Sequence, residues 1–170
     1  GAGLGAWDWW LETNEVSFDR RWCEMLGLKL EQTVQNLSTW DERVHPEDKA
    51  KAYQDIQNYL EGKTERYENV HRLRHADGRW IWILDRGKVS AWDDTGKPIR
   101  FTGTHFEITG YKELRHLTES IQQMGHIGGW EMDAETGKTK WTPETYKIHA
   151  IDENAPTDKI MGINFFAPHE

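Results

Sequence analysis

Three runs of β-branched and aromatic residues stand out in the middle of the chain, at residues 67–75, 79–89 and 99–109. Asp77-Gly78 separates the first two runs and is typical of a two-residue type I′ hairpin, in which both central residues take positive φ. Thr95-Gly96 supplies the next reversal, and Pro98 suits a strand start, where its missing N–H costs least. The pattern therefore predicts a three-stranded antiparallel meander.

The N-terminal part changes from a strand pattern to a helical one. Residues 5–11 and 15–18 predict two short strands, and Asn14 between them tolerates the positive φ of a tight turn. Asp19 suits the N-cap of a short helix over residues 20–26. The inward residues of this helix are expected to be Trp22, Met25 and Leu26, and Gly27 is expected to close it.

A longer helix is predicted from Pro46, which suits the first helical position, to Gly62. Its apolar stripe is Tyr53, Ile56 and Leu60. Before it we expect a helical turn at residues 30–33 and a brief helix opened by the capping-box pattern of Ser38 and Asp41. Two strands, several helices and three strands together predict an α+β fold, a five-stranded antiparallel sheet covered by helices on one face.

After Thr109 the apolar residues recur with a helical period, which predicts a linker helix over residues 110–125. Spacings of three, four and three residues make an a/d seam of Leu114, Leu117, Ile121 and Met124. The seam lasts less than two heptads, so we expect it to form a weak homodimer.

An internal repeat follows the linker. Residues 128–137 restate residues 5–14, Trp141 stands where Phe18 stood, and Thr142 gives a second N-cap. The last five residues, 166–170, resemble 44–48. We therefore expect three parts: a domain over residues 1–109, the linker, and the truncated start of a second domain over 126–170. The last part lacks a meander and is not expected to fold alone.

Composition narrows the classes of partner. The 170 residues include ten Trp, enough for a sizeable core. With 21 Lys and Arg against 29 Asp and Glu, the net charge is −8, which argues against nucleic acid as a partner. One cysteine fits a reducing cytoplasm, and no apolar run approaches the roughly 20 residues of a membrane helix. We expect a cytoplasmic chain, and the full-length protein could still be membrane-anchored.

The order and spacing of these patterns resemble a PAS domain with its C-terminal PAC segment, of the subclass frequent in bacterial multidomain sensors. The residues that carry the resemblance are Trp7-Asp8, Phe18, Met25-Leu26-Gly27-Leu28, Val44-His45-Pro46-Glu47-Asp48, Tyr67-Glu68, Arg72-Leu73-Arg74, Asp77-Gly78, Trp82, Gly103-Thr104 and Ile108-Thr109. The resemblance implies a sheet with strand order 2-1-5-4-3, and it implies sensing, dimerisation and relay rather than catalysis.

In the family, the residues implied to relay the signal are an Asp-Ile-Thr sequence at the sheet exit, the point where the last strand of the sheet leads into the linker helix. Here it is Glu107-Ile108-Thr109, followed by Gly110-Tyr111 in place of a charged pair. Glu107 is expected to bond backbone donors at the sheet exit, and Thr109 to make a local hydrogen bond at the start of the linker helix.

A ligand pocket under the helices is the second implied site. The candidate lining residues are Trp22, Met25, Tyr53, Ile56, Arg72 and Trp82. The tryptophans suit an aromatic cage or a flavin ring, and they equally suit a plain core. Arg72 shares strand parity with Glu68 and is expected either to pair with it or to hold a ligand carboxylate.

Cysteine and histidine raise the question of a cofactor. Cys23 lacks the Asn-Cys-Arg-Phe signature of flavin-bonding photoreceptors, so we interpret it as a small buried hydrophobe. His71 and His75 share a strand face but lie too far apart to chelate one metal ion. We expect no cofactor and no metal, with flavin or haem as the alternative.

No catalytic set is evident in the sequence, and no phosphoacceptor or cyclase motif is present. The sequence therefore predicts a non-enzymatic sensory and interaction module. It would relay a ligand or redox state to an output domain of the same polypeptide, such as a histidine kinase or a diguanylate cyclase. The alternative is a flavin- or haem-binding redox or gas sensor.

Overall fold

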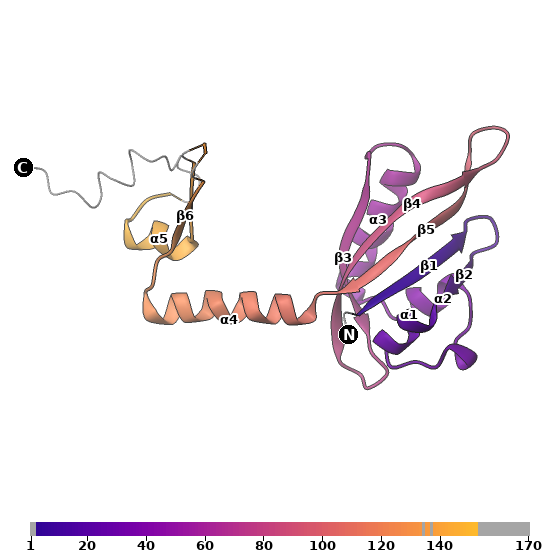
Figure 1. Ribbon diagram of the computed structural model, residues 1–170, viewed down its shortest axis with the longest axis horizontal. Coiled ribbons are helices and arrows are strands. Elements are labelled where there is room, and N and C mark those ends of the chain that lie inside the picture. The colour runs from indigo at the N-terminus through magenta and orange to yellow at the C-terminus, as the bar shows by residue number, and fades with distance from the viewer. Residues whose placement is uncertain (1–2, 134, 137, 153–170) are drawn as a thin grey trace, which may run out of the picture. The chain divides into compact units, whose positions relative to one another are not determined.

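Five strands form one antiparallel sheet in the order β2-β1-β5-β4-β3 (Figure 1). The computed structural model describes residues 3–133, 135–136 and 138–152. The strands are β1 (Leu4–Trp10), β2 (Glu15–Phe18), β3 (Tyr67–Arg74), β4 (Trp80–Trp92) and β5 (Pro98–Glu107). The predicted meander and the strand order implied by the family resemblance are both confirmed.

Four short or medium helices follow the first hairpin and cover one face of the sheet (Figure 1). They are α1 (Arg20–Met25), the 3-10 turn η1 (Leu30–Gln32), α2 (Leu37–Asp41) and α3 (Pro46–Leu60). The Asp19 carboxylate caps α1 by accepting from Trp22 N at 2.7 Å, as predicted. The predicted capping box at Ser38 is wrong, because Asn36 Oδ1 accepts from Ser38 N at 3.0 Å and so starts α2 two residues earlier.

The turn between β3 and β4 also differs from the prediction. Gly78 has a φ of 94°, whereas Asp77 does not take positive φ. His75 N donates to Arg79 O at 2.9 Å and Gly78 N donates to His75 O, which makes a longer turn than the type I′ hairpin. The Asp77 carboxylate accepts from Arg79 N at 3.1 Å, and this bond favours a right-handed conformation at Asp77.

The core lies between the sheet and the helices, because alternate strand residues face the helices. Its fully buried side chains include Trp22 of α1, Leu26 at the C-cap of that helix and four from the strands: Leu73, Ile81, Ile83 and Phe101. In α3 the buried residues are Ala52 and Ile56, whereas Tyr53 of the predicted stripe lies at the edge and is 36% exposed.

The helix α4 (Thr109–Gly125) begins two residues after the end of β5. The chain divides into two compact units between Lys112 and Glu113, inside this helix. The second unit continues with β6 (Trp130–Met132), β7 (Thr139–Trp141) and α5 (Pro143–Ile148). The resemblance of 166–170 to 44–48 lies outside the described residues.

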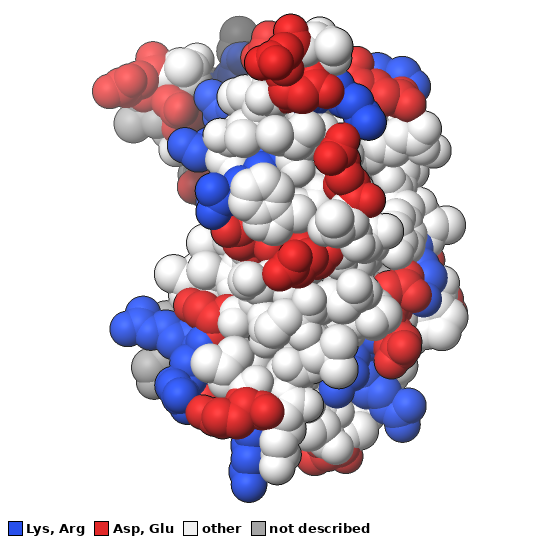
Figure 2. Space-filling view, turned by 90° about the vertical axis from the view of Figure 1, so that its right-hand side faces the viewer, with Lys and Arg blue, Asp and Glu red and all other residues white. Residues whose placement is uncertain are grey.

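Two surface properties bear on partners. In the part of the chain that the structure describes, no helix is both long and apolar enough to cross a membrane. Figure 2 shows acidic and basic side chains interspersed on one face, without a continuous basic surface. The absence of a nucleic-acid partner stays a prediction.

Candidate functional site

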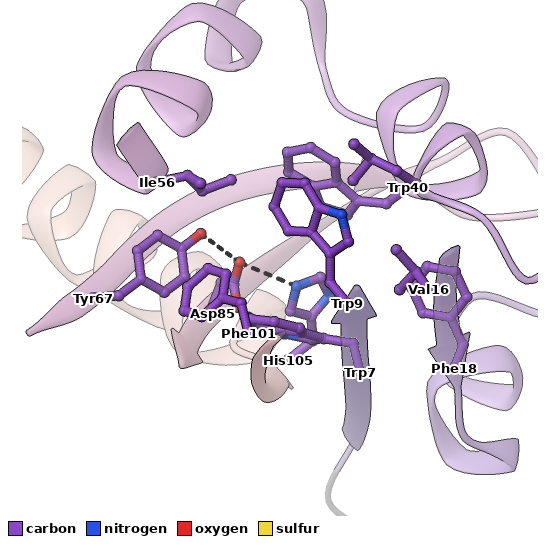
Figure 3. A pocket seen from close by; sticks show the side chains of 11 residues that line it. Trp7, Trp9, Val16, Phe18, Trp40, Ile56, Tyr67, Asp85, Phe101 and His105 are labelled. Carbon is purple, nitrogen blue, oxygen red and sulfur yellow. Dashed lines mark hydrogen bonds and ion pairs between the residues drawn. The ribbon is translucent and has the colours of Figure 1, made fainter. Parts of the chain in front are cut away.

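A small cavity of about 30 Å³ lies between the sheet and the helices (Figure 3). All five strands, α2 and α3 contribute to its wall, which consists of Trp7, Trp9, Val16, Phe18, Leu37, Trp40, Ile56, Tyr67, Asp85, Phe101 and His105. A cavity of this volume has room for about two water-sized groups. The lining is mostly aromatic, and its two strongly polar groups are Asp85 and His105.

Two glycines make room for the Trp7 indole at the centre of the sheet. Gly103 of β5 lies opposite both Trp7 of β1 and Gly87 of β4. A Cβ on Gly103 would come within 2.4 Å of Trp7 Cζ2, and one on Gly87 within 2.7 Å of Trp7 Cη2. The indole therefore lies across both glycines, and its Nε1 reaches Asp85.

Asp85 is the most deeply buried acid of the site and is 3% exposed. Trp7 Nε1 donates to its Oδ1 at 3.0 Å, Tyr67 OH donates to Oδ2 at 2.6 Å, and His105 Nε2 lies 3.2 Å from Oδ2. Burial raises the pKa of Asp85, but His105, and after it His71 and Tyr67, stabilise the anion, and the net shift of the pKa is downward. The carboxylate is therefore ionised at neutral pH.

Hydrogen bonds on both sides hold the His105 ring in place. Trp22 Nε1 donates to His105 Nδ1 at 2.9 Å. His105 Nε2, on the other side of the ring, faces the Asp85 carboxylate.

A second indole binds His71, the other buried histidine of the network. Trp40 Nε1 donates to His71 Nε2 at 3.1 Å, so the proton lies on Nδ1, which donates to Asn69 Oδ1 at 2.9 Å. Burial, and after it the neighbouring His105, lowers the pKa of His71 to about 4. Asn69 Nδ2 donates in turn to Asp55 of α3 at 2.5 Å, which extends the network toward the surface.

The structure places the sequence-predicted pocket residues in different surroundings. Ile56 lines the cavity. Trp22 does not line the cavity but stacks on Phe18, which does, with 3.8 Å between the ring centroids. Met25 is buried in the core, and Tyr53 donates its OH to Asp41 at 2.8 Å on the surface.

Arg72 and Trp82 face away from the cavity. The Arg72 guanidinium binds Asp48 at 2.7–2.8 Å and Glu47 at 2.9 Å, and its carbon lies 5.1 Å from the Trp82 ring centroid. The expected pair of Arg72 with Glu68 is wrong, because Asp48 and Glu47 bind the Arg72 guanidinium. Glu68 instead accepts from Arg86 Nε at 2.6 Å.

The polar centre of the site was not predicted from the sequence. His71 was interpreted as an ordinary strand position, and Asn69, Asp85 and His105 carry no motif that marks them. The alternation along each strand could have indicated them, since these residues occupy the same alternate positions as the buried apolar residues of their strands and therefore face the core. Register brings them together, because Asp85 lies opposite Asn69 on one side and His105 on the other.

At the sheet exit the backbone of Trp82 anchors the start of α4. Ile108 N donates to Trp82 O at 2.8 Å, and Trp82 N donates to Thr109 Oγ1 at 3.0 Å. Thr109 therefore makes its bond across the sheet rather than locally as predicted. The expected bond of Glu107 is not found, because its carboxylate has no hydrogen-bond partner among the described residues, and its backbone N donates to Gly3 O.

We tested whether a metal or a large cofactor fits these residues. Ligand atoms of His71, Asp85 and His105 lie within 4.8 Å of one another. However, an indole N–H already occupies the free lone pair of each histidine. The cavity of about 30 Å³ is smaller than the roughly 300–1,000 Å³ of ordinary ligand pockets, and the absence of a flavin or a haem stays a prediction.

Comparison with known proteins gives a family and several relatives. The PAS fold family matches residues 15–105. The probable diguanylate cyclase DgcE of Escherichia coli (strain K12) is 24% identical over 153 positions, which cover 84% of this chain and 13% of that protein. The hybrid signal transduction histidine kinase A of Dictyostelium discoideum is 29% identical over 86 positions, 49% of this chain and 4% of that protein. The chain thus spans a small part of either relative.

Solved structures agree with the fold. A sensory box histidine kinase/response regulator from Burkholderia thailandensis E264 is 26% identical with a TM-score of 0.61, covering 72% of this chain and 93% of that one. The N-terminal domain of a diguanylate cyclase with PAS/PAC sensor from Marinobacter aquaeolei is 24% identical with a TM-score of 0.57, covering 64% and 98%. An RNA-binding light-oxygen-voltage receptor is 12% identical with a TM-score of 0.54, covering 90% and 42%. The last two show the fold alone.

Proposed function

The chain belongs to the PAS fold family, and from this premise we propose that it is the sensory segment of a longer signalling protein. The output module would be a diguanylate cyclase or a histidine kinase, as in the relatives that match it, and it would lie elsewhere in the polypeptide. In this proposal the segment described here senses and relays and does not itself catalyse a reaction.

One observation carries the proposal: the buried network and the sheet exit lie on the same two strands. Asp85 and His105 face each other across β4 and β5. Three residues before Asp85 on β4 is Trp82, whose backbone binds Ile108 and Thr109 beyond the end of β5. A change of hydrogen bonding at Asp85 therefore acts on the strand pair that positions the first turn of α4.

The relay that we propose is a shift between two arrangements of this strand pair. Of the three predicted relay residues, Glu107, Ile108 and Thr109, it is Thr109 whose side chain is bonded across the junction. Loss of one such bond changes a free energy by about 1 kcal/mol. That is a several-fold change in a two-state equilibrium and too little to unfold the domain.

The proposal also includes a weak homodimer through α4. Leu114, Leu117 and Ile121 are 54–64% exposed, and Met124 is 85% exposed. An exposed apolar seam of this kind is typical of a helix that packs against a second copy. Dimer packing would then carry the shift of the strand pair to the output module.

We further propose that residues 126–170 begin a second domain of the same kind. The support is the pairing register, since Trp130 faces Trp141 in the second hairpin as Trp7 faces Phe18 in the first. A helix with a Thr or Asp at its N-cap follows each hairpin.

The relay is tested in the full-length protein by measuring its output, either cyclic dinucleotide formed from GTP or autophosphorylation from ATP. Thr109→Val keeps the shape of the side chain and removes the acceptor for Trp82 N, so we expect output to change about five-fold with little change in melting temperature. Thr118→Val is the matched control, because the Thr118 hydroxyl bonds only its own helix at Leu114 O. Unchanged output in Thr109→Val would refute the relay.

The alternative, a flavin- or haem-bound sensor, rests on the likeness of fold to light-oxygen-voltage receptors. An absorbance spectrum of the purified protein from the near ultraviolet through the visible separates the two proposals. We expect only the aromatic band, and a flavin or Soret band would favour the alternative.

A further inference from the structure

The outer face of the sheet carries an indole ring that two cations approach. Trp82 of β4 is half-buried and faces away from the core, and the Arg72 guanidinium carbon lies 5.1 Å from its ring centroid. The Lys112 ammonium lies 4.9 Å from the same centroid. Cations within about 6 Å of an aromatic ring are attracted by its π electrons, and Trp attracts them most strongly. The Trp82 ring therefore holds one cation from β3 and one from α4.

The Lys112 contact attaches the first turn of α4 to the sheet through a side chain. Ile108 N donates to Trp82 O at 2.8 Å, and Thr109 Oγ1 accepts from Trp82 N. Lys112 N donates to Ile108 O at 3.0 Å, so Lys112 lies in the first helical turn after that point. The backbone of Trp82 thus binds the chain where α4 begins, and its ring binds a side chain further along the turn. Two such attachments fix the direction in which the helix leaves the sheet.

The Arg72 contact connects the same ring to the start of α3. Arg72 Nε and Nη2 donate to the two carboxylate oxygens of Asp48 at 2.8 and 2.7 Å. Nη2 also donates to Glu47 at 2.9 Å, and the backbone N of Arg72 donates to Asp48 at 2.9 Å. A guanidinium bound by two parallel hydrogen bonds to one carboxylate is held in one orientation. The position of the Arg72 side chain therefore follows the first turn of α3.

The same helix α3 also contacts the buried site. Ile56 lines the cavity, and Asp55 accepts from Asn69 of the buried network at 2.5 Å. Asp48 and Asp55 belong to one helix and lie about two turns apart. A regular helix transmits a displacement over this length as a rigid element. A movement of α3 at the cavity therefore reaches Arg72.

We propose that the contacts of Arg72 and Lys112 with the Trp82 ring form an aromatic bridge, which transmits the position of α3 to the start of α4. The inference rests on the proposed sensory function and adds to its relay a second route on the outer face of the sheet. In this route Trp82 is a positioning residue, because it acts on α4 through Lys112 and contacts no ligand. The Trp82 ring is the charge partner of Lys112 among the described residues, so a shift of the ring moves the ammonium with it.

The test measures the output of the full-length protein together with hydrogen exchange of the backbone amide at position 112. Lys112→Gln removes the charge, and we expect both output and exchange rate to change about three-fold at an unchanged melting temperature. Lys112→Arg retains a cation and should restore both values. Lys88→Gln is the matched control, because Lys88 is exposed on the same face of β4. Unchanged output and exchange in Lys112→Gln would overturn the proposal.

A double-mutant cycle tests whether Lys112 acts through the ring. Trp82→Leu removes the ring and keeps the backbone bonds to Ile108 and Thr109. In this background we expect Lys112→Gln to have no further effect on output or exchange, because the contact is already lost. Effects of the two substitutions that add in full would show that Lys112 acts through another partner, and would refute the aromatic bridge.

The link to α3 has its own variants. Asp48→Asn weakens the hold on Arg72, and we expect output to change in the same direction as in Lys112→Gln. Glu47→Gln removes only the exposed half of the pair, so it should give a smaller change and tests the link even where Asp48→Asn does not fold. Unchanged output in both would refute the link. If Lys112→Gln has no effect while Thr109→Val still changes output, the relay stands and only the aromatic bridge is wrong.

Discussion

The chain contains two hairpins with related sequences and the same register but very different burial. Trp7 faces Phe18 in the first hairpin, and Trp130 faces Trp141 in the second. Phe18 and Trp141 are 5% and 7% exposed, so the aromatic residue that ends the second strand of each hairpin is buried. Trp7 is 7% exposed, whereas Trp130, its counterpart, is 59% exposed.

The difference in burial shows which packing contacts a hairpin forms with its own neighbouring helix and which contacts require the other strands of the sheet. The second-strand aromatic packs on the helix that follows, Phe18 on Trp22 and Trp141 near Tyr146. The first-strand Trp needs strands from far along the chain, since Trp7 lies across Gly103 and binds Asp85. In the described part of the chain β6 pairs only with β7, so Trp130 has no such surface.

The largest expected effect comes from cutting the chain between the two hairpins. Residues 1–112 expressed alone should unfold in one cooperative transition, because they contain the complete sheet. Residues 126–170 alone should show no transition, because a two-stranded hairpin is marginal in water. Thermal scans by circular dichroism decide this, and a cooperative transition in the second fragment would break the comparison.

The next effect comes from removing the equivalent tryptophans in the intact chain. Trp7→Ala should destabilise the sheet by about 3–5 kcal/mol, since it empties a buried site and strips Asp85 of a donor. Trp130→Ala should change the stability of its hairpin by less than about 1 kcal/mol. Amide hydrogen exchange reports each hairpin separately. Trp10→Ala is the control on β1, because Trp10 faces outward and is 40% exposed.

Acid should destabilise the first unit by about 2 kcal/mol between pH 7 and pH 5. His71 has a folded-state pKa of about 4 and an ordinary value of 6.5, so the unfolded chain binds more protons between these values. The stabilisation is complete above pH 6.5 and is lost as the pH falls toward 4. Urea unfolding at several pH values measures it.

A matched pair of histidines tests that assignment. His71→Gln retains an acceptor for Trp40 and should remove most of the pH dependence in this range. His126→Gln should leave it nearly unchanged, because the His126 side chain is 84% exposed even though it contacts Glu144. Equal effects of the two variants would show that burial of His71 is not the cause.

The smallest effect on folding is expected from the helix between the hairpins. Leu117→Lys with Ile121→Lys should abolish a weak dimer, because both side chains are exposed on the seam and lysine cannot be buried there without cost. The free energy of unfolding should change by less than about 0.5 kcal/mol. Sedimentation velocity measures the dimer, with Gln123→Lys as the control outside the seam. An unchanged dimer fraction would place the interface elsewhere.

Local chemistry made much of the fold predictable. Positive φ at Asn14, Gly27 and Gly96 follows from residue type, and so does the Asp19 cap. The errors arose where two residues compete for one role. Asn36 and Ser38 can both cap a helix, and only the path of the preceding loop decides between them.

The candidate site was less predictable because it depends on register between distant strands. Strand parity places Asp85 on the inner face, but its two partners come from pairings 16 and 20 residues away in sequence. Arg72 illustrates the converse, since its parity with Glu68 suggested a pair, whereas the register sets Glu68 opposite Arg86. Hydrogen bonds from Trp22 and Trp40, which fix both histidines, could not be inferred from periodicity.

The short junction between β5 and α4 has a mechanical consequence. Glu107 ends the strand and Thr109 begins the helix, so no flexible loop absorbs a change in strand direction. The 17 residues of α4 form a lever arm about 25 Å long at about 1.5 Å per residue. In the proposed relay, a tilt of about 5° at one end of a rigid helix of this length would displace its other end by about 2 Å, a movement as large as the radius of an atom.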